Sequence, residues 1–272
     1  MEIIGYLSAS LMGIVLGVIG GGGSVLTVPI LVYLMGIAPD IATGYSLLIV
    51  GLTAAFGAIR YFRQGLVDIP ASIAFAIPAI LAVYGSRAYL MPNIPSQFEI
   101  ASLSFAKNVI IMVVFAILML LSAILMLKKA YQHTDSHLTS ASTFPTEAPI
   151  HINWFLIIIE GAVVGVITGI LGAGGGFLII PALVLLMGMP MHKAVGASLF
   201  IIALKSLIGF IGDLQNGIVI EMPMIPLLLI ATGIGMFLST HISSRLESQT
   251  LQKIFAFFTL IIAVVIISKE LL

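Results

Sequence analysis

The stretch "GVIGGGGSVLTVPILVYLMG" at residues 17–36 decides the fold of this chain, because it recurs 152 residues later as "GILGAGGGFLIIPALVLLMG" at residues 169–188. Of the 20 paired positions, 11 are identical. In each copy a run of glycines interrupts an apolar segment, and a proline, Pro29 or Pro181, follows. Glycine and proline are both unfavourable inside a helix. Each copy therefore predicts a helix that breaks and then restarts.

The composition around these breaks is that of a membrane protein. Of the 272 residues, 60% are hydrophobic and 8% are charged, and the mean hydropathy is +1.23. Soluble domains carry about 25% charged residues. Apolar runs such as residues 108–127 are about long enough to cross a bilayer as one helix. Because these runs are apolar on all faces, which excludes a membrane β-barrel, we predict an all-α polytopic membrane protein.

The whole chain consists of two copies of one unit. The copies align without a gap from Gly17 to about Val67, and a polar stretch rich in Ser, Thr, His and Pro lies between them. This predicts a first transmembrane repeat at 1–127, a polar linker at 128–151 and a second transmembrane repeat at 152–272. Internal repeats of this kind are typical of secondary transporters.

The topology depends on one short apolar segment, residues 24–36. Apart from it, the first copy holds four clear spans, at 3–19, 41–60, 69–90 and 102–127. If the segment continues the first span, the repeats are parallel, and the Lys and Arg residues outside the spans divide evenly between the two sides. If it turns back, each half has five helical segments and the repeats are inverted.

The inverted arrangement agrees better with the positions of the basic residues. It places seven of them on one side and three on the other, as the positive-inside rule expects, with both termini outside. The seven are Arg60, Arg63, Lys128, Lys129, Lys193, Arg245 and Lys253. We therefore predict two inverted repeats of about five helical segments, each including a helix broken at a Gly-rich loop.

The glycine runs predict a site for a small anion. After each break a short helix begins, near Ser24 or Gly176, and its first amides have no intrahelical partner. These amides and the helix dipole favour negative charge, and glycine lets an oxyanion approach the backbone. The predicted walls of the site are Gly20, Gly21, Gly22, Gly23, Ser24, Gly172, Gly174, Gly175 and Gly176. The alternative is close helix packing, for which membrane proteins also use small residues.

Four other polar residues in apolar runs are candidates for the site. Lys205 lies in the middle of a span, where a cation normally faces a cavity or a partner; it could neutralise the anion or pair with Glu160. Glu160 is itself a candidate for proton coupling, or lies near the membrane surface. Ser46 and Ser198 occupy corresponding positions and could donate to the anion, or bond to their own helix backbone.

Two further pairs of polar residues lie at the ends of predicted spans. Arg87 and Asp213 are expected to be interfacial for that reason. Gln64 and Asn216 each precede a glycine, so we predict that they are mainly turn residues.

The motifs "GVIGGGGSVLTVPIL" and "GILGAGGGFLIIPAL", each followed by a Gly-x-Ser-Leu helix, resemble the TauE/SafE family of sulfite exporters over nearly the whole chain. The resemblance implies transport of small sulfur-containing or organic anions, such as sulfite and sulfonates. We therefore expect a multi-pass secondary transporter of the inner (cytoplasmic) membrane that works by alternating access, with proton coupling left open. The alternatives are an anion channel of the same fold and a membrane protein without a transport role.

The expected partners follow from composition. The chain has no cysteine and its histidines lack ligand spacing, so we expect neither a metal nor a cofactor. No Ser/His/Asp set lies at membrane depth, so we do not expect an enzyme. The net charge is zero, which speaks against nucleic acid as a partner. A small anion and the lipid bilayer are the expected partners, and a homodimer is left open.

Overall fold

The computed structural model describes residues 2–94, 97–100, 103–136, 154–172, 174–243 and 246–271. Residues 137–151, which are most of the linker predicted at 128–151, lie outside the described residues. The first half contains α1 (Glu2–Ile19), a 3-10 turn (Gly21–Gly23), α2 (Ser24–Pro29) with a π-helical extension (Ile30–Leu34), α3 (Pro39–Arg63), α4 (Ile69–Gly85) with a π-helical turn (Ser86–Leu90), α5 (Met91–Asn93), β1 (Gln97–Ile100), β2 (Leu103–Ala106) and α6 (Lys107–Ser136). The second half contains α7 (Trp154–Leu171), α8 (Gly176–Pro181) with a π-helical extension (Ala182–Leu186), α9 (Met191–Gln215), α10 (Met224–Ser243) and α11 (Ser248–Leu271).

The described helices confirm a polytopic helical membrane protein. Five of them are long and apolar enough to cross a membrane: Pro39–Arg63, Ile69–Asn93, Val109–Lys128, Met191–Gln215 and Gln249–Lys269. Shorter apolar helices accompany them: Ile4–Ile19, Ser24–Leu34, Ile157–Leu171, Gly176–Leu185 and Met224–Ser239. Large apolar side chains remain exposed on these helices, as expected where hydrocarbon replaces water as the solvent.

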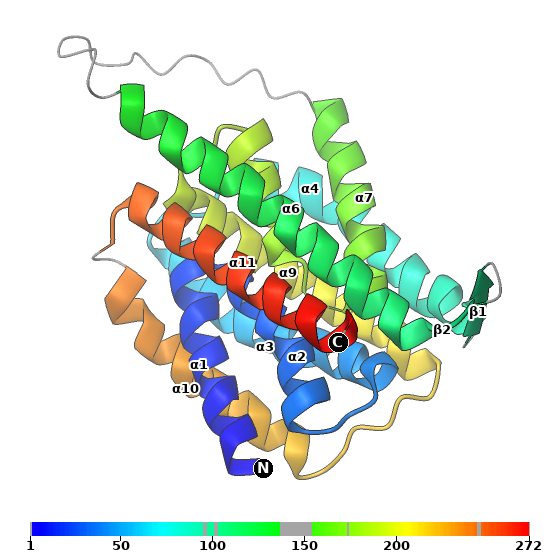
Figure 1. Ribbon diagram of the computed structural model, residues 1–272. Coiled ribbons are helices and arrows are strands. Elements are labelled where there is room, and N and C mark those ends of the chain that lie inside the picture. The colour runs from blue at the N-terminus through cyan, green and yellow to red at the C-terminus, as the bar shows by residue number, and fades with distance from the viewer. Residues whose placement is uncertain are drawn as a thin grey trace.

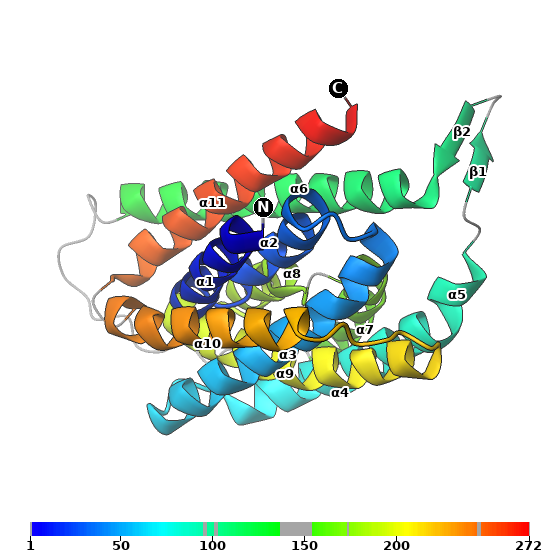
Figure 2. The same ribbon diagram turned by 90° about the horizontal axis from the view of Figure 1, so that it is seen from below.

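The two halves interlock helix by helix (Figures 1 and 2). The largest helix contacts are α1 with α10, α3 with α9, α6 with α11 and α4 with α7, and each joins one helix from each half. Helices α3 and α9 run antiparallel, because Gly44 lies against Asp213 near one end and Gly57 lies against Leu199 near the other. The centre of the bundle is therefore built by both halves.

The α1–α10 and α4–α7 contacts are made in the same way, by a glycine of one helix packed against a serine of the other segment. In the α1–α10 contact, a Cβ on Gly17 would collide with Ser239, and in the α7–α4 contact a Cβ on Gly169 would meet the Cβ of Ser86 at 2.8 Å. Small residues let membrane helices approach this closely. Matched contacts of this kind are what a duplicated unit would make; the inverted repeat itself stays a prediction.

The segment after the first glycine run turns back along α1. A Cβ built on Gly5, near the start of α1, would lie 3.1 Å from the Cγ of Met35. If residues 5–35 formed one continuous helix, these two residues would be about 45 Å apart. The inverted arrangement requires this return of the chain.

The helix ends gather at two opposite ends of the bundle. In Figure 2 the ends of α3, α6 and α10 and the start of α11 gather at one end of the bundle, while the β1–β2 hairpin and the end of α9 lie at the other. Arg60 and Arg63 are in the last turn of α3, and Lys269 is in the last turn of α11.

The predicted span at 102–127 is wrong at its start. Residues 103–106 form β2, which pairs antiparallel with β1 and places Phe105 opposite Phe98. Apolar residues alternate along both strands, which is the period of a strand and not of a helix. Helix α6 begins only at Lys107 and runs to Ser136, inside the segment predicted as the linker.

The return of the chain after the first break can be tested with cysteines, since the chain has none of its own. We expect Gly5→Cys with Met35→Cys to form a disulfide under mild oxidation, because a disulfide needs Cβ atoms about 3.5–4.5 Å apart. Peptide mass spectrometry would detect the linked pair. Gly5→Cys with Ser24→Cys is the control that should stay reduced. Absence of the Gly5–Met35 link, with both thiols reactive toward maleimide, would contradict the return.

Candidate functional site

Glycines with left-handed backbone angles shape both helix breaks. They are Gly20 (φ 74°), Gly172 (φ 66°), Gly174 (φ 63°) and Gly175 (φ 77°). Residues with a Cβ rarely adopt these angles, so the local geometry of the two loops requires glycine. In the first run the remaining glycines form the 3-10 turn Gly21–Gly23, and α2 begins directly after it.

The two glycine runs touch each other at the centre of the bundle. A Cβ on Gly21 would collide with the Cα of Gly176, and a Cβ on Gly176 would collide with the Cα of Gly21. Around this contact, Gly172 lies against Thr43 of α3, and a Cβ on Gly20 would come within 2.9 Å of Ser198 Oγ on α9. Close packing by itself explains why Gly21 and Gly176 are glycines.

The helix starts at the two breaks have no side-chain caps. Gly23 precedes α2 and Gly175 precedes α8, and neither residue can offer a side-chain acceptor to the first amides. The Ser24 hydroxyl donates instead to the Gly21 carbonyl at 2.5 Å, within its own loop. The first turns of α2 and α8 thus meet with their N-terminal ends close together.

Lys205 lies beside the second glycine run. Its side chain is fully buried, and a Cβ on Gly175 would lie 2.8 Å from its Nζ. Nζ donates to Thr168 Oγ1 at 2.6 Å. An ammonium carries three N–H donors. Within the described residues the structure shows this one acceptor and no ion pair for Lys205, so the cation at the glycine run lacks a counter-charge.

Glu160 does not join this group. Both of its carboxylate oxygens are buried and have no hydrogen-bond partner in the described part of the chain. It lies two turns before Thr168 on α7, about 12 Å along the helix axis. The alternative ion pair between Lys205 and Glu160 is therefore not formed, and Glu160 stands apart from the glycine runs.

The two serines of the site are used differently. Ser198 donates to the carbonyl of Val195 at 2.8 Å, a bond to its own helix, although it lies against the first glycine run. Ser46 is fully buried, and its hydroxyl has no partner among the described residues.

Arg87 and Asp213, which are predicted to be interfacial, are buried between helices near one end of the bundle. Arg87 is 1% exposed and Asp213 is 4% exposed, and Arg87 Nη1 lies 3.4 Å from Asp213 Oδ1. Nη1 also donates to Thr43 Oγ1 at 3.1 Å. Both residues are close to helix ends in the sequence, but the ends of α4 and α9 cover each other. The sequence does hold one indication of this ion pair: each half of the chain carries one of the two opposite charges in an apolar segment.

A cavity of about 240 Å³ opens beside this ion pair. Its lining residues are Asp40, Ile41, Arg87, Met91, Pro92, Asp213, Asn216 and Ile218. Asn216 follows the last turn of α9, as expected of a turn residue, and its Nδ2 donates to the Arg87 carbonyl at 2.9 Å. A polar cavity thus lies at the C-terminal end of α9.

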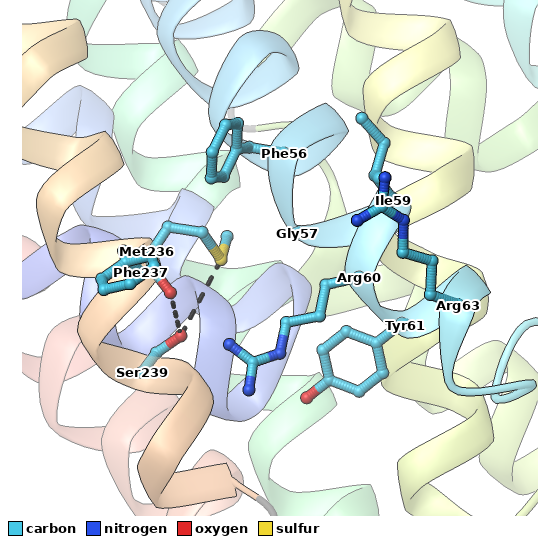
Figure 3. A pocket seen from close by; sticks show the side chains of 9 residues that line it. All are labelled: Phe56, Gly57, Ile59, Arg60, Tyr61, Arg63, Met236, Phe237 and Ser239. Carbon is cyan, nitrogen blue, oxygen red and sulfur yellow. Dashed lines mark hydrogen bonds between the residues drawn. The ribbon is translucent and has the colours of Figure 1, made fainter.

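A second pocket, of about 380 Å³, lies at the C-terminal end of α3 (Figure 3). Its walls include Phe56 and Ile59 of α3 and Phe237 of α10. Figure 3 shows the Arg60 side chain extending from α3 toward Ser239 on α10. Because α3 and α9 are antiparallel, this largely apolar pocket and the Arg87 cavity lie at opposite ends of the bundle.

A polytopic bundle with helices broken around buried polar groups is the architecture of a membrane transporter. The chain belongs to the TauE/SafE sulfite exporter family, whose sequence profile, described as Sulfite exporter TauE/SafE, matches residues 6–266.

Similar proteins have names of the same kind. A probable membrane transporter protein of Xylella fastidiosa (strain 9a5c) is 28% identical over 269 residues, which are 97% of this chain and 94% of that protein. The probable membrane transporter protein YunE of Bacillus subtilis (strain 168) is 29% identical over 223 residues, 76% of this chain and 77% of that protein. No solved structure matches the chain.

The backbone contact between the glycine runs predicts that neither Gly21 nor Gly176 can be replaced by a larger residue without loss of stability. We expect Gly21→Ala or Gly176→Ala to lower the free energy of unfolding by at least about 1–3 kcal/mol, the usual cost of overpacking, because the added Cβ meets backbone that cannot rotate away. Thermal unfolding followed by size-exclusion chromatography in detergent measures the loss. Gly233→Ala is the control, since a Cβ there meets open space and alanine favours helix. Equal stability of Gly21→Ala and Gly233→Ala would contradict the contact.

Proposed function

We propose that this transporter is a secondary carrier for small oxyanions, sulfite or sulfonates, in the cytoplasmic membrane. The observation that carries the proposal is the buried Lys205 ammonium at the second glycine run, with one neutral acceptor, Thr168, and no ion pair among the described residues. A buried charge without a partner is costly, and a bound anion would supply the missing charge. The description of the family as sulfite exporters supports the class of anion.

In the proposed bound state the anion lies between the two glycine runs. Lys205 neutralises it, and the uncapped amides at the starts of α2 and α8 donate to its oxygens. Gly20–Ser24, Gly172 and Gly174–Gly176 form the walls, and Ser46, whose hydroxyl has no partner among the described residues, is the candidate for a further donor. Ser198 would have to leave the carbonyl of Val195 to take part.

The contact between Gly21 and Gly176 supports a mechanism of alternating access. Their backbones touch, so an anion can enter between them only if the two glycine runs separate. Substrate binding is thereby tied to a movement of one half against the other, as in other carriers built from repeats. The Arg87 cavity is the candidate entrance for the anion at one end of the bundle.

Glu160 is the candidate for proton coupling in this scheme. Its buried carboxylate oxygens have no partner in the described residues, and a carboxyl group in such surroundings can exchange a proton during transport. The transported anion is released chemically unchanged, so the carrier needs no catalytic residue and no cofactor.

Transport by the purified protein in liposomes tests the proposal. We expect uptake of radiolabelled sulfite that saturates with concentration and is competed by methanesulfonate, because a carrier binds its substrate at a limited number of sites. Repeating the measurement with a pH gradient tests proton coupling. Uptake that rises without saturation would favour an anion channel instead. No uptake above that of empty liposomes would exclude sulfite as the substrate.

The role of Lys205 gives a separate prediction. We expect Lys205→Ala to reduce sulfite uptake at subsaturating concentration about 10- to 100-fold, since a hydrogen bond to a charged group is worth about 1.5–3 kcal/mol. Lys193→Ala, an exposed lysine on the same helix, is the control and should keep its activity. Both variants are compared at equal amounts of folded protein. A fully active Lys205→Ala variant would remove Lys205 from the site.

A further inference from the structure

We propose that Arg87 forms a second oxyanion-binding site, in the cavity at the C-terminal end of α9. The ligand class is a small anion with at least two oxygens on one atom, such as a sulfonate, sulfite or a carboxylate. The binding claim stands on the side chains of this cavity alone. The claim that the site lies on the route of transport rests on the proposed function.

The guanidinium of Arg87 has its most useful binding edge unoccupied. Nη1 donates to Thr43 Oγ1 at 3.1 Å and lies 3.4 Å from Asp213 Oδ1. Nε and Nη2 are buried and have no acceptor within the described residues. The N–H groups on these two atoms are parallel and match the spacing of two oxygens of an oxyanion. Buried donors are rarely left without an acceptor, so this edge is where an anion would bind.

Asp213 does not fill that edge. Its contact with Arg87 is a single long bond to Nη1, and Oδ2 has no partner among the described residues. A carboxylate that fully neutralised the arginine would bind it through two parallel bonds. The pair is thus incomplete on both sides. Nε and Nη2 are covered in this structure, so an oxyanion reaches them after a shift of the Arg87 side chain, and it does not have to displace Asp213 from these two atoms.

The cavity offers room for such an anion. Its volume of about 240 Å³ equals that of about eight molecules of liquid water. Arg87 is the one cation among the described residues that line it, and Asp40 and Asp213 are acids. The two carboxylates weaken the binding of an anion, which suits a site that an anion passes through and does not occupy permanently.

The position of Arg87 connects the cavity to the glycine runs. Thr43 accepts a hydrogen bond from Arg87, and its Cα and Cβ lie directly against Gly172. Lys205 lies two turns from Asp213 on α9, about 12 Å along the axis. An anion that leaves Arg87 therefore has Thr43 between it and the second glycine run.

Anion binding to the full-length protein in nanodiscs tests the site, with methanesulfonate as the probe in isothermal titration calorimetry. We expect Arg87→Gln to remove one class of binding site and Asp213→Asn to tighten binding to that class roughly tenfold, because the competing negative charge is gone. Lys205→Ala should leave this class intact. Arg63→Gln, in the pocket of Figure 3, is the control for loss of an arginine elsewhere.

A purely structural ion pair would give the opposite result, since Asp213→Asn would then weaken or leave unchanged the affinity for the anion. Either outcome, or an Arg87→Gln variant that keeps every binding class, overturns the proposal. If these variants fail to fold, Arg87→Lys provides the readout, because it keeps the positive charge and removes the paired N–H groups. Arg87→Lys should weaken methanesulfonate binding to this class at least severalfold, and an unchanged affinity counts against the site. If the protein binds methanesulfonate at Arg87 but does not transport sulfite, only the proposed function is refuted.

Discussion

The rest of this structure depends on the backbone contact between Gly21 and Gly176. Each residue stands where a membrane helix breaks, and each leaves no room for a Cβ on the other. In a bilayer a broken helix is tolerated only where protein or a cavity covers the freed backbone groups. Here each break is covered by the break of the other half and by α3 and α9, which cross beside it. The backbone contact between Gly21 and Gly176 therefore stabilises both helix breaks, each of which would be unfavourable in a bilayer without the other.

The same arrangement explains why the buried charges are informative. Lys205 and Arg87 lie in helices whose other buried residues are mostly apolar, and the structure leaves N–H donors of both without protein acceptors among the described residues. Burying a cation in this way is costly unless a negative group approaches it. Lys205 adjoins the second glycine run, and Arg87 reaches the same run through Thr43. Both charges thus point to an anion as the ligand, from independent contacts.

Much of the fold could be predicted from local patterns, and the failures have identifiable causes. The apolar runs predicted the spanning helices, and the glycines predicted the breaks, because both signals lie within one segment of chain. The alternation of apolar residues in 97–106 is that of strands, so the span predicted at 102–127 begins inside a strand. The burial of Arg87 and Asp213 could not be predicted, because nearness to a helix end in sequence says nothing of the helix packed over that end. The ion pair considered between Lys205 and Glu160 is absent for a similar reason, because the Lys205 ammonium donates its hydrogen bond to Thr168 instead.

The sequence by itself determined which segments enter the membrane, where two of them break and where the chain carries charge. Hydropathy and glycine conformation are properties of neighbouring residues, so no tertiary contact is needed to infer them. Only the tertiary structure decided which polar groups meet: Gly21 with Gly176, Lys205 with Thr168, and Arg87 with an aspartate 126 residues away. The first and third of these contacts join the two halves of the chain, and the second lies within the second half. All of the partners are selected by how helices pack against each other, which no local pattern encodes.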